Sequence, residues 1–234
     1  MDDKITSLAV VIPAAGVGKR MQANCPKQYL KINELTILEH TALRLLSHPN
    51  VGLVVIALGK NDEYFPQTSL CNLPNVQVVI GGNERVDSVL AGLKVINNDI
   101  YPWAMVHDAA RPCVTHQDIS NLISQCMHYD QGGLLASPVR DTMKQASIST
   151  AETVKNSVDK TIERNHLWHA FTPQMYKTDE LILAIEAGLN KQMNITDESS
   201  AIEMFGLPSQ LIEGRGDNIK ITRKDDLAMA AFIL

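Results

Sequence analysis

Short apolar runs recur along this chain and predict the strands of a sheet. The first run, residues 8–12, is continuously apolar and stops at Pro13, so we expect a strand that is covered on both faces. Further strands are predicted at residues 53–58, 76–80, 103–107, 133–139 and 210–213.

Between these runs the apolar positions follow a helical period. From Val86 to Ile96 they stand at i, i+3, i+4, i+7 and i+10, which predicts an amphipathic helix. Thr36 and Glu39 have the spacing of a capping box and predict the start of another. Helices are also expected through residues 119–126, 181–189 and 196–205 and after Thr222. Alternating strands and helices imply an α/β fold, a Rossmann-like three-layer sandwich around a mostly parallel mixed sheet.

Residues 140–169 interrupt this alternation. The helical period disappears there, and β-prone stretches such as Thr161-Ile162 replace it. Such long loops within compact domains are usually functional or disordered, and Trp168 argues against disorder. We therefore expect residues 1–234 to form one domain, from which residues 140–169 protrude as a β-arm.

Charge and cysteine content narrow the classes of function. The chain has 21 Lys and Arg and 26 Asp and Glu, a formal net charge of −5, without the basic blocks that bind nucleic acid. Its four cysteines form no CxxC pair and are expected to stay reduced. The N-terminus lacks a basic segment, and Pro13 and Gly16 break the apolar run that follows. We therefore expect a cytoplasmic protein with no nucleic-acid partner and no membrane span.

The sharpest chemical signal is the segment Pro13-Ala14-Ala15-Gly16-Val17-Gly18-Lys19-Arg20-Met21, which directly follows the first predicted strand. Small residues at the carboxyl end of a strand let backbone N–H groups approach phosphate oxygens closely. Met21 stands where a dinucleotide fingerprint requires glycine, and Arg20 stands where a P-loop requires Ser or Thr. The segment thus predicts a phosphate-binding loop of another class, although glycine spacing alone equally fits a tight turn without a ligand.

Two cations accompany this loop, Arg20 and Lys27. A nucleoside triphosphate that is attacked at its α-phosphorus accumulates negative charge on its non-bridging oxygens. A fixed cation at that point is typically worth about two to three orders of magnitude in rate. Arg20 and Lys27 are therefore candidate catalytic residues, whereas either one in isolation would be an ordinary surface charge.

The loop and the following Pro26-Lys27-Gln28 resemble the nucleotidyltransferases with a Rossmann-like fold. Further blocks in the same order resemble the 2-C-methyl-D-erythritol 4-phosphate cytidylyltransferases in particular, from about residue 8 to about residue 230. These blocks are Gly81-Gly82-Asn83-Glu84-Arg85-Val86-Asp87-Ser88-Val89, Val106-His107-Asp108-Ala109-Ala110-Arg111-Pro112, Pro138-Val139-Arg140-Asp141-Thr142-Met143-Lys144, Leu167-Trp168-His169-Ala170-Phe171-Thr172-Pro173-Gln174, Ile195-Thr196-Asp197-Glu198 and Asp217-Asn218-Ile219-Lys220-Ile221-Thr222.

The resemblance implies the transfer of CMP from CTP to 2-C-methyl-D-erythritol 4-phosphate, with release of pyrophosphate, in non-mevalonate isoprenoid biosynthesis. Mg²⁺ is the implied cofactor, held mainly by the CTP phosphates, with Asp108 as a further candidate ligand. Arg20 and Lys27 would stabilise the transition state. The residues implied to bind the nucleotide are Ala14, Ala15, Gly16, Gly82, Asn83 and Ser88.

On the acceptor side, the resemblance assigns Asp108 to the methylerythritol hydroxyls. Arg164 and Lys220 would aim the acceptor phosphate, which makes them catalytic as well as substrate-binding residues. The implied acceptor-binding set is Asp108, Arg111, Thr142, Arg164, Thr196 and Lys220. In this family Thr142 and Arg164 lie on an arm that crosses to a neighbouring subunit, so residues 140–169 are expected to act as a dimerisation arm of a homodimer.

Several alternatives remain open at this stage. Asn83 stands where the family often has aspartate, and an amide side chain that contacted the base could pair with cytosine or with uracil, whereas a backbone contact would leave discrimination unchanged. A cytidylyltransferase for another polyol phosphate, such as ribitol 5-phosphate, would share much of the pattern. A non-catalytic nucleotide-binding module would keep the pocket without turnover. His107 and His169 are expected to be structural, because an ionised acceptor phosphate needs no general base.

Overall fold

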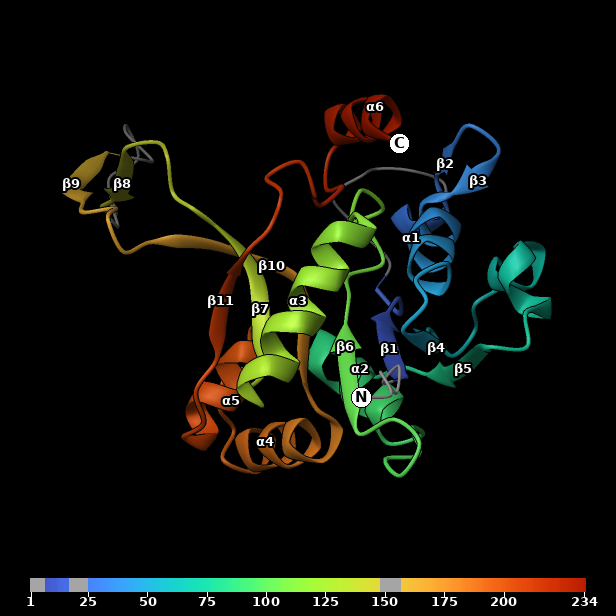
Figure 1. Ribbon diagram of the computed structural model, residues 1–234. Helices are drawn as coiled ribbons and strands as arrows, with labels where there is room; N and C mark the ends of the chain where they lie inside the picture. The colour runs from blue at the N-terminus through green and yellow to red at the C-terminus, as the bar shows by residue number, and fades with distance from the viewer. Residues whose placement is uncertain (1–6, 17–24, 148–156) are drawn as a thin grey trace.

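A seven-stranded sheet forms the centre of the molecule (Figure 1). The structure is a computed structural model that describes residues 7–16, 25–147 and 157–234. The strands lie in the order β11-β7-β10-β6-β1-β4-β5. β10 runs antiparallel to its neighbours β6 and β7, and the other neighbouring pairs are parallel, so the predicted mostly parallel mixed sheet is confirmed. The bounds are Leu8–Pro13 (β1), Val51–Leu58 (β4), Val76–Ile80 (β5), Trp103–Val106 (β6), Gly133–Pro138 (β7), Trp168–Lys177 (β10) and Gln210–Glu213 (β11).

Helices cover both faces of the sheet, which explains why β1 is apolar throughout. Val10 and Ile12 enter the core on one face, whereas Ala9 and Val11 enter the core on the other. Both faces of the strand therefore lose their contact with water, as expected for a central parallel strand. The helices are α1 (Ile37–Leu46) and α3 (His116–Tyr129) on the first face, and α2 (Arg85–Leu93), α4 (Thr178–Asn190) and α5 (Glu198–Phe205) on the second.

Smaller elements complete the wall around the carboxyl ends of the strands. The C-terminal helix α6 (Lys224–Ile233) contributes Ala230 to a small apolar cluster with Ile32, Ile37 and Ile221. None of the helices in the described ranges combines the length and apolar character that a bilayer crossing requires. The remaining short elements of those ranges are η2 (Lys27–Tyr29), β2 (Lys31–Ile32), β3 (Leu35–Thr36), η3 (Phe65–Gln67) and η4 (Ser69–Asn72).

The predicted start of α1 is confirmed, and the predicted end of α2 is wrong. The Glu39 N–H donates to Thr36 Oγ1 at 3.2 Å, and the Thr36 N–H donates to the Glu39 carboxylate at 2.8 Å, which forms the capping box. The helix predicted from Val86 to Ile96 ends at Leu93. Ile96 is buried outside the helix, so its apolar character reflects packing rather than helical periodicity.

Within the seven-stranded sheet, β10 is a strand that the apolar pattern did not predict. It contains Pro173, which cannot donate a ladder hydrogen bond and ordinarily argues against an internal strand. In the structure the register with β7 shifts between Ala170 and Gln174, so Pro173 lies within an irregular stretch. The buried polar residues Thr172 and Gln174 also interrupt the apolar pattern that a central strand usually shows.

The predicted arm is a two-stranded antiparallel hairpin that stands away from the sheet (Figure 1). It consists of β8 (Met143–Ala146) and β9 (Val158–Ile162), paired from Met143 opposite Ile162 onward. The last two residues of the predicted segment 140–169 belong to β10 and therefore to the sheet. The hairpin and the central sheet are thus joined directly through β7 and β10.

Candidate active site

The loop after β1 is held in place by a buried glutamine. Gln28 is 3% exposed, and its Nε2 donates to the carbonyl oxygens of Ala14 at 2.7 Å and Gly16 at 3.1 Å. These contacts leave the small side chains of Ala14 and Ala15 on the rim of a cavity, which Gly16 also lines. Arg20 lies outside the described residues, so its predicted role stays a prediction.

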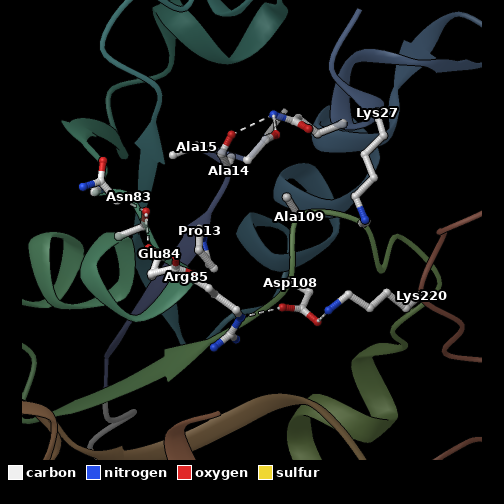
Figure 2. Close-up of a pocket in the computed structure, with 15 residues that line it drawn as sticks. Pro13, Ala14, Ala15, Lys27, Asn83, Glu84, Arg85, Asp108, Ala109 and Lys220 are labelled. Carbon is white, nitrogen blue, oxygen red and sulfur yellow. Dashed lines mark hydrogen bonds and ion pairs between the residues drawn. The ribbon is translucent and has the colours of Figure 1, made fainter. Parts of the chain in front are cut away.

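Lys27 reaches the same cavity from the short helix η2 (Figure 2). Its Nζ donates to the carbonyl oxygen of Ile221 at 3.1 Å, next to Lys220 in the chain. The phosphate-loop side of the cavity and the C-terminal segment are therefore linked through this ammonium group. A cation held beside small residues and backbone amides has the character needed to stabilise a polyphosphate.

The opposite rim of the cavity is the turn between β5 and α2. The Gly82 N–H donates to Ser88 Oγ at 3.1 Å, which folds the turn back on the helix. A Cβ at Gly82 would stand 2.2 Å from the Cβ of Asp87, so only glycine fits there. Gly82, Asn83 and Ser88, which the family resemblance assigns to the nucleotide, all line this cavity. The Asn83 side chain points away from Lys27 and Asp108 (Figure 2).

Asp108 lies at the carboxyl end of β6, where three cations surround its carboxylate. Its Oδ1 is 3.1 Å from Arg85 Nε, and its Oδ2 is 2.8 Å from Lys220 Nζ and 3.5 Å from Arg111 Nε. Burial alone would raise the pKa of Asp108, but the positive charges of Arg85 and Lys220, joined by Arg111, hold it well below its ordinary value. Asp108 is therefore an ionised side chain whose two oxygens are already engaged.

A second carboxylate anchors this cluster from behind. Arg85 Nη1 donates to Glu198 Oε1 at 2.6 Å, and Nη2 donates to Oε2 at 3.2 Å, a bidentate contact. Burial raises the pKa of Glu198, against the opposing effect of Arg85, whereas the two neighbouring carboxylates raise the pKa of Arg85 in spite of its burial. Sequence reasoning named neither residue as functional, because a pairing across 113 positions leaves no local signal.

Arg111 and its surroundings are fixed by a second, neutral network. Arg111 Nη1 donates to the carbonyl oxygen of Asn218 at 2.6 Å, and Asn218 Nδ2 donates to that of Thr172 at 2.8 Å. His107 Nε2 lies 2.9 Å from the Arg111 carbonyl oxygen and Nδ1 lies 3.0 Å from Thr172 Oγ1. Because a carbonyl can only accept, Nε2 carries the proton and the Thr172 hydroxyl donates to Nδ1. Burial lowers the pKa of His107 to about 4, so the ring is neutral near pH 7.

Two adjoining cavities therefore meet at Arg85, Asp108 and Lys220. The first is lined by the residues predicted for the nucleotide, and Figure 2 shows Arg85, Asp108 and Lys220 in a row across it. The second is lined by predicted acceptor residues, Arg111 and Thr196, together with residues of β10. The structure thus brings together Ala14, Ala15, Gly16, Lys27, Gly82, Asn83, Ser88, Asp108, Arg111, Thr196 and Lys220.

Thr142 and Arg164 are not part of these cavities. They line a separate hollow on the arm with Thr161, Ile162 and Glu163. The guanidinium of Arg164 donates to the carbonyl oxygen of Arg140, within the same arm. Within one chain, the predicted acceptor residues are therefore divided between the body of the molecule and the arm.

The donor set of the described residues does not form a metal site by itself. No group of three or more His, Cys, Asp or Glu side chains in residues 7–16, 25–147 and 157–234 is arranged to hold a metal ion. Asp108, the candidate ligand, is already contacted by cations at both oxygens. A divalent ion at this site would consequently depend on phosphate oxygens for most of its ligands.

A comparison with known families decides between the alternatives left by the sequence. The family model described as IspD, 2-C-methyl-D-erythritol 4-phosphate cytidylyltransferase, matches residues 8–234. The chain belongs to this family. Membership in the 2-C-methyl-D-erythritol 4-phosphate cytidylyltransferases favours the main interpretation over a ribitol phosphate enzyme and over a non-catalytic module.

Individual relatives agree with this assignment over nearly the whole chain. The chain is 57% identical to 2-C-methyl-D-erythritol 4-phosphate cytidylyltransferase of Colwellia psychrerythraea over 96% of its own length and 93% of that protein. It is 51% identical to the enzyme of the same name from Escherichia coli O127:H6, covering 97% of this chain and 93% of the relative. The crystal structure of the Francisella tularensis cytidylyltransferase (IspD) superposes with a TM-score of 0.81 at 37% identity, over 97% of this chain and 100% of the other.

Proposed function

We propose that this protein transfers CMP from CTP to 2-C-methyl-D-erythritol 4-phosphate, giving 4-diphosphocytidyl-2-C-methyl-D-erythritol and pyrophosphate in the non-mevalonate isoprenoid pathway. The observation that carries the proposal is the pair of cavities that share the Arg85–Asp108–Lys220 row in a member of this family. One cavity has the small residues and backbone of a phosphate loop, and the other has cations for a second anion. Two substrates that must meet at one phosphorus need such an arrangement.

The nucleotide occupies the first cavity in this proposal. Ala14, Ala15 and Gly16 present their backbone to the CTP phosphates, while Gly82, Asn83 and Ser88 border the nucleoside. Lys27, with Arg20 from the same loop region, neutralises charge at the α-phosphorus as the acceptor phosphate oxygen attacks and the bond to the pyrophosphate breaks. No covalent enzyme intermediate is required.

The acceptor occupies the second cavity. Asp108 accepts hydrogen bonds from polyol hydroxyls, and Arg111 and Lys220 attract the phosphate. Thr196 lies on the same rim, ahead of the α5 N-terminus. The phosphate is already ionised near neutral pH, so its positioning rather than its deprotonation is the task of these residues.

We also propose that Thr142 and Arg164 reach the acceptor of a neighbouring subunit in a homodimer. The support is their placement on the protruding hairpin, away from the cavities of their own chain (Figure 1). A symmetric exchange of arms would complete two composite sites, each with the body of one subunit and the arm of the other.

Mg²⁺ belongs to the proposal as a companion of CTP. The donor set of the described residues fits an ion held chiefly by nucleotide phosphates, with Asp108 nearby. When bound, the ion would reduce the charge repulsion between the two anionic substrates. A cytoplasmic location is also proposed, because all four cysteines are free thiols, as expected in a reducing compartment.

Pyrophosphate release tests the function directly. Purified protein would be supplied with CTP, Mg²⁺ and either 2-C-methyl-D-erythritol 4-phosphate or ribitol 5-phosphate, with UTP in parallel reactions. We expect release with CTP and the methylerythritol phosphate only. Preference for ribitol 5-phosphate would show that the acceptor is another polyol phosphate. Absence of pyrophosphate release with every acceptor would contradict catalysis.

A further inference from the structure

Glu198 is a buried carboxylate for which the proposed reaction gives no task. Its side chain is 2% exposed, the lowest value among the ion-paired carboxylates of the described residues. It is the first residue of α5, two positions after Thr196 of the acceptor cavity. Burying a carboxylate is costly unless a charge partner compensates, and its partner is Arg85 at 2.6 and 3.2 Å.

The shape of the arginine side chain couples Glu198 to Asp108. The guanidinium is planar, so the two Nη contacts with Glu198 fix the direction of the Nε–H bond. That bond is the one that points to Asp108 Oδ1, at 3.1 Å. A movement of the Glu198 carboxylate would rotate the guanidinium plane and release one oxygen of Asp108.

The charge of the cluster leads to the same residue. Arg85, Arg111 and Lys220 face the two carboxylates Asp108 and Glu198, so these five ion-paired groups carry one net positive charge, which Asp197 on the rim of the acceptor cavity offsets. Arg85 lines both cavities. Without Glu198 its guanidinium would lose one of its two carboxylate partners and could turn toward a substrate phosphate.

We propose that Glu198 is a positioning residue: it holds the Arg85 guanidinium in the orientation that contacts Asp108 and thereby sets the acceptor-binding geometry. The inference rests on the proposed function, because it assigns Asp108 to the polyol phosphate. It predicts an effect that is specific for one substrate. The acceptor site should deteriorate more than the CTP site when Glu198 changes, because most of the CTP site is formed by the loop after β1 and the turn before α2, which Glu198 does not contact.

Glu198→Gln tests this substrate specificity, because the amide keeps the size of the side chain and removes its charge. We expect the KM for 2-C-methyl-D-erythritol 4-phosphate to rise by about 10- to 100-fold, and the KM for CTP to change by a much smaller factor, because Arg85 only borders the nucleotide cavity. Glu186→Gln is the matched control. It makes the same chemical change and breaks an exposed ion pair, between Glu186 on α4 and Lys94 at the end of α2. An unchanged acceptor KM, or equal rises in both KM values, would overturn the inference.

A double-variant cycle separates positioning from general loss of stability. Arg85→Gln should raise the acceptor KM, and Arg85→Gln with Glu198→Gln should raise it no further, because Glu198 acts through Arg85. Arg85→Gln alone leaves the buried Glu198 carboxylate without its cation, whereas the double variant removes both charges, so thermal unfolding of the two separates a loss of stability from a loss of acceptor affinity. If the KM increase of the double variant were the product of the two single increases, the residues would act independently and the inference would be wrong. Wild-type protein without turnover would instead refute the proposed function, which keeps the two failures distinct.

Discussion

The body of the molecule and its arm treat charged side chains in opposite ways. In the body, Asp108 is buried and enclosed by Arg85, Lys220 and Arg111. On the arm, Arg164 is exposed, and its guanidinium contacts a backbone carbonyl of the same arm. A buried charge is costly unless it is paired in the folded chain, whereas an exposed cation is solvated and needs no ion-pair partner before a ligand binds. The difference fits the proposal that a site prearranged in the body is completed by an arm.

The largest expected effect lies in the body. Lys27→Ala should lower kcat by about two to three orders of magnitude, because it removes a fixed cation from the phosphate cavity. Thermal unfolding should change little, and Lys31→Ala, which alters an exposed lysine on β2, should leave kcat unchanged. Near-normal turnover of the Lys27 variant would remove this residue from the catalytic set.

His107, in the neutral network around Arg111, predicts that the free energy of unfolding depends on pH. Because the pKa of His107 is lowered in the folded state to about 4, folding favours the neutral ring. The stabilisation is complete above the unfolded pKa, about 6.5, and is lost as the pH falls towards 4, with a maximum of about 3 kcal/mol.

Urea unfolding between pH 7.5 and pH 4.5 measures this dependence. His107→Gln replaces the titratable ring by a neutral amide, so the free energy of unfolding of this variant should fall less steeply over that range. Parallel curves for the two proteins would show that other groups cause the acid sensitivity.

The arm predicts a substrate-specific effect. Arg164→Ala should lower kcat/KM for the polyol phosphate by roughly 10- to 100-fold, since a phosphate contact is lost. CTP affinity, measured by calorimetry, should not change. Lys160→Ala removes another exposed cation from β9 and serves as the control. A matching loss of CTP affinity would contradict the assignment of Arg164 to the acceptor.

The smallest effect concerns the nucleobase. Asn83 is exposed and points away from Lys27 and Asp108, which favours recognition of the base by backbone groups of the turn. Asn83→Ala should change the ratio of CTP to UTP turnover by no more than about twofold, as for an ordinary surface substitution. A tenfold change would show that the amide reads the base.

Local signals predicted most of the fold and the loop that lines the first cavity. The apolar run of β1 and the capping box at Thr36 depend on neighbours in the sequence, and both were predicted correctly. The small residues after β1 likewise indicated a cavity that the structure contains.

Features that depend on distant residues were not predictable in this way. Pro173 disguised β10, because its compatibility depends on an irregular register with β7. Glu198 gains significance only through Arg85, and Gln28 only through the carbonyl groups that it holds. These contacts arise when separate elements pack, so no local pattern contains them.

Mixed subunits test the division between body and arm most directly. Lys27→Ala and Arg164→Ala chains, each with its own affinity tag, would be co-expressed, and dimers that carry both tags would be isolated. If the arm acts in the neighbouring subunit, one site contains both substitutions and the other contains none, so activity should return to about half that of the wild type. Activity no greater than that of the better single variant would contradict a site shared between two chains.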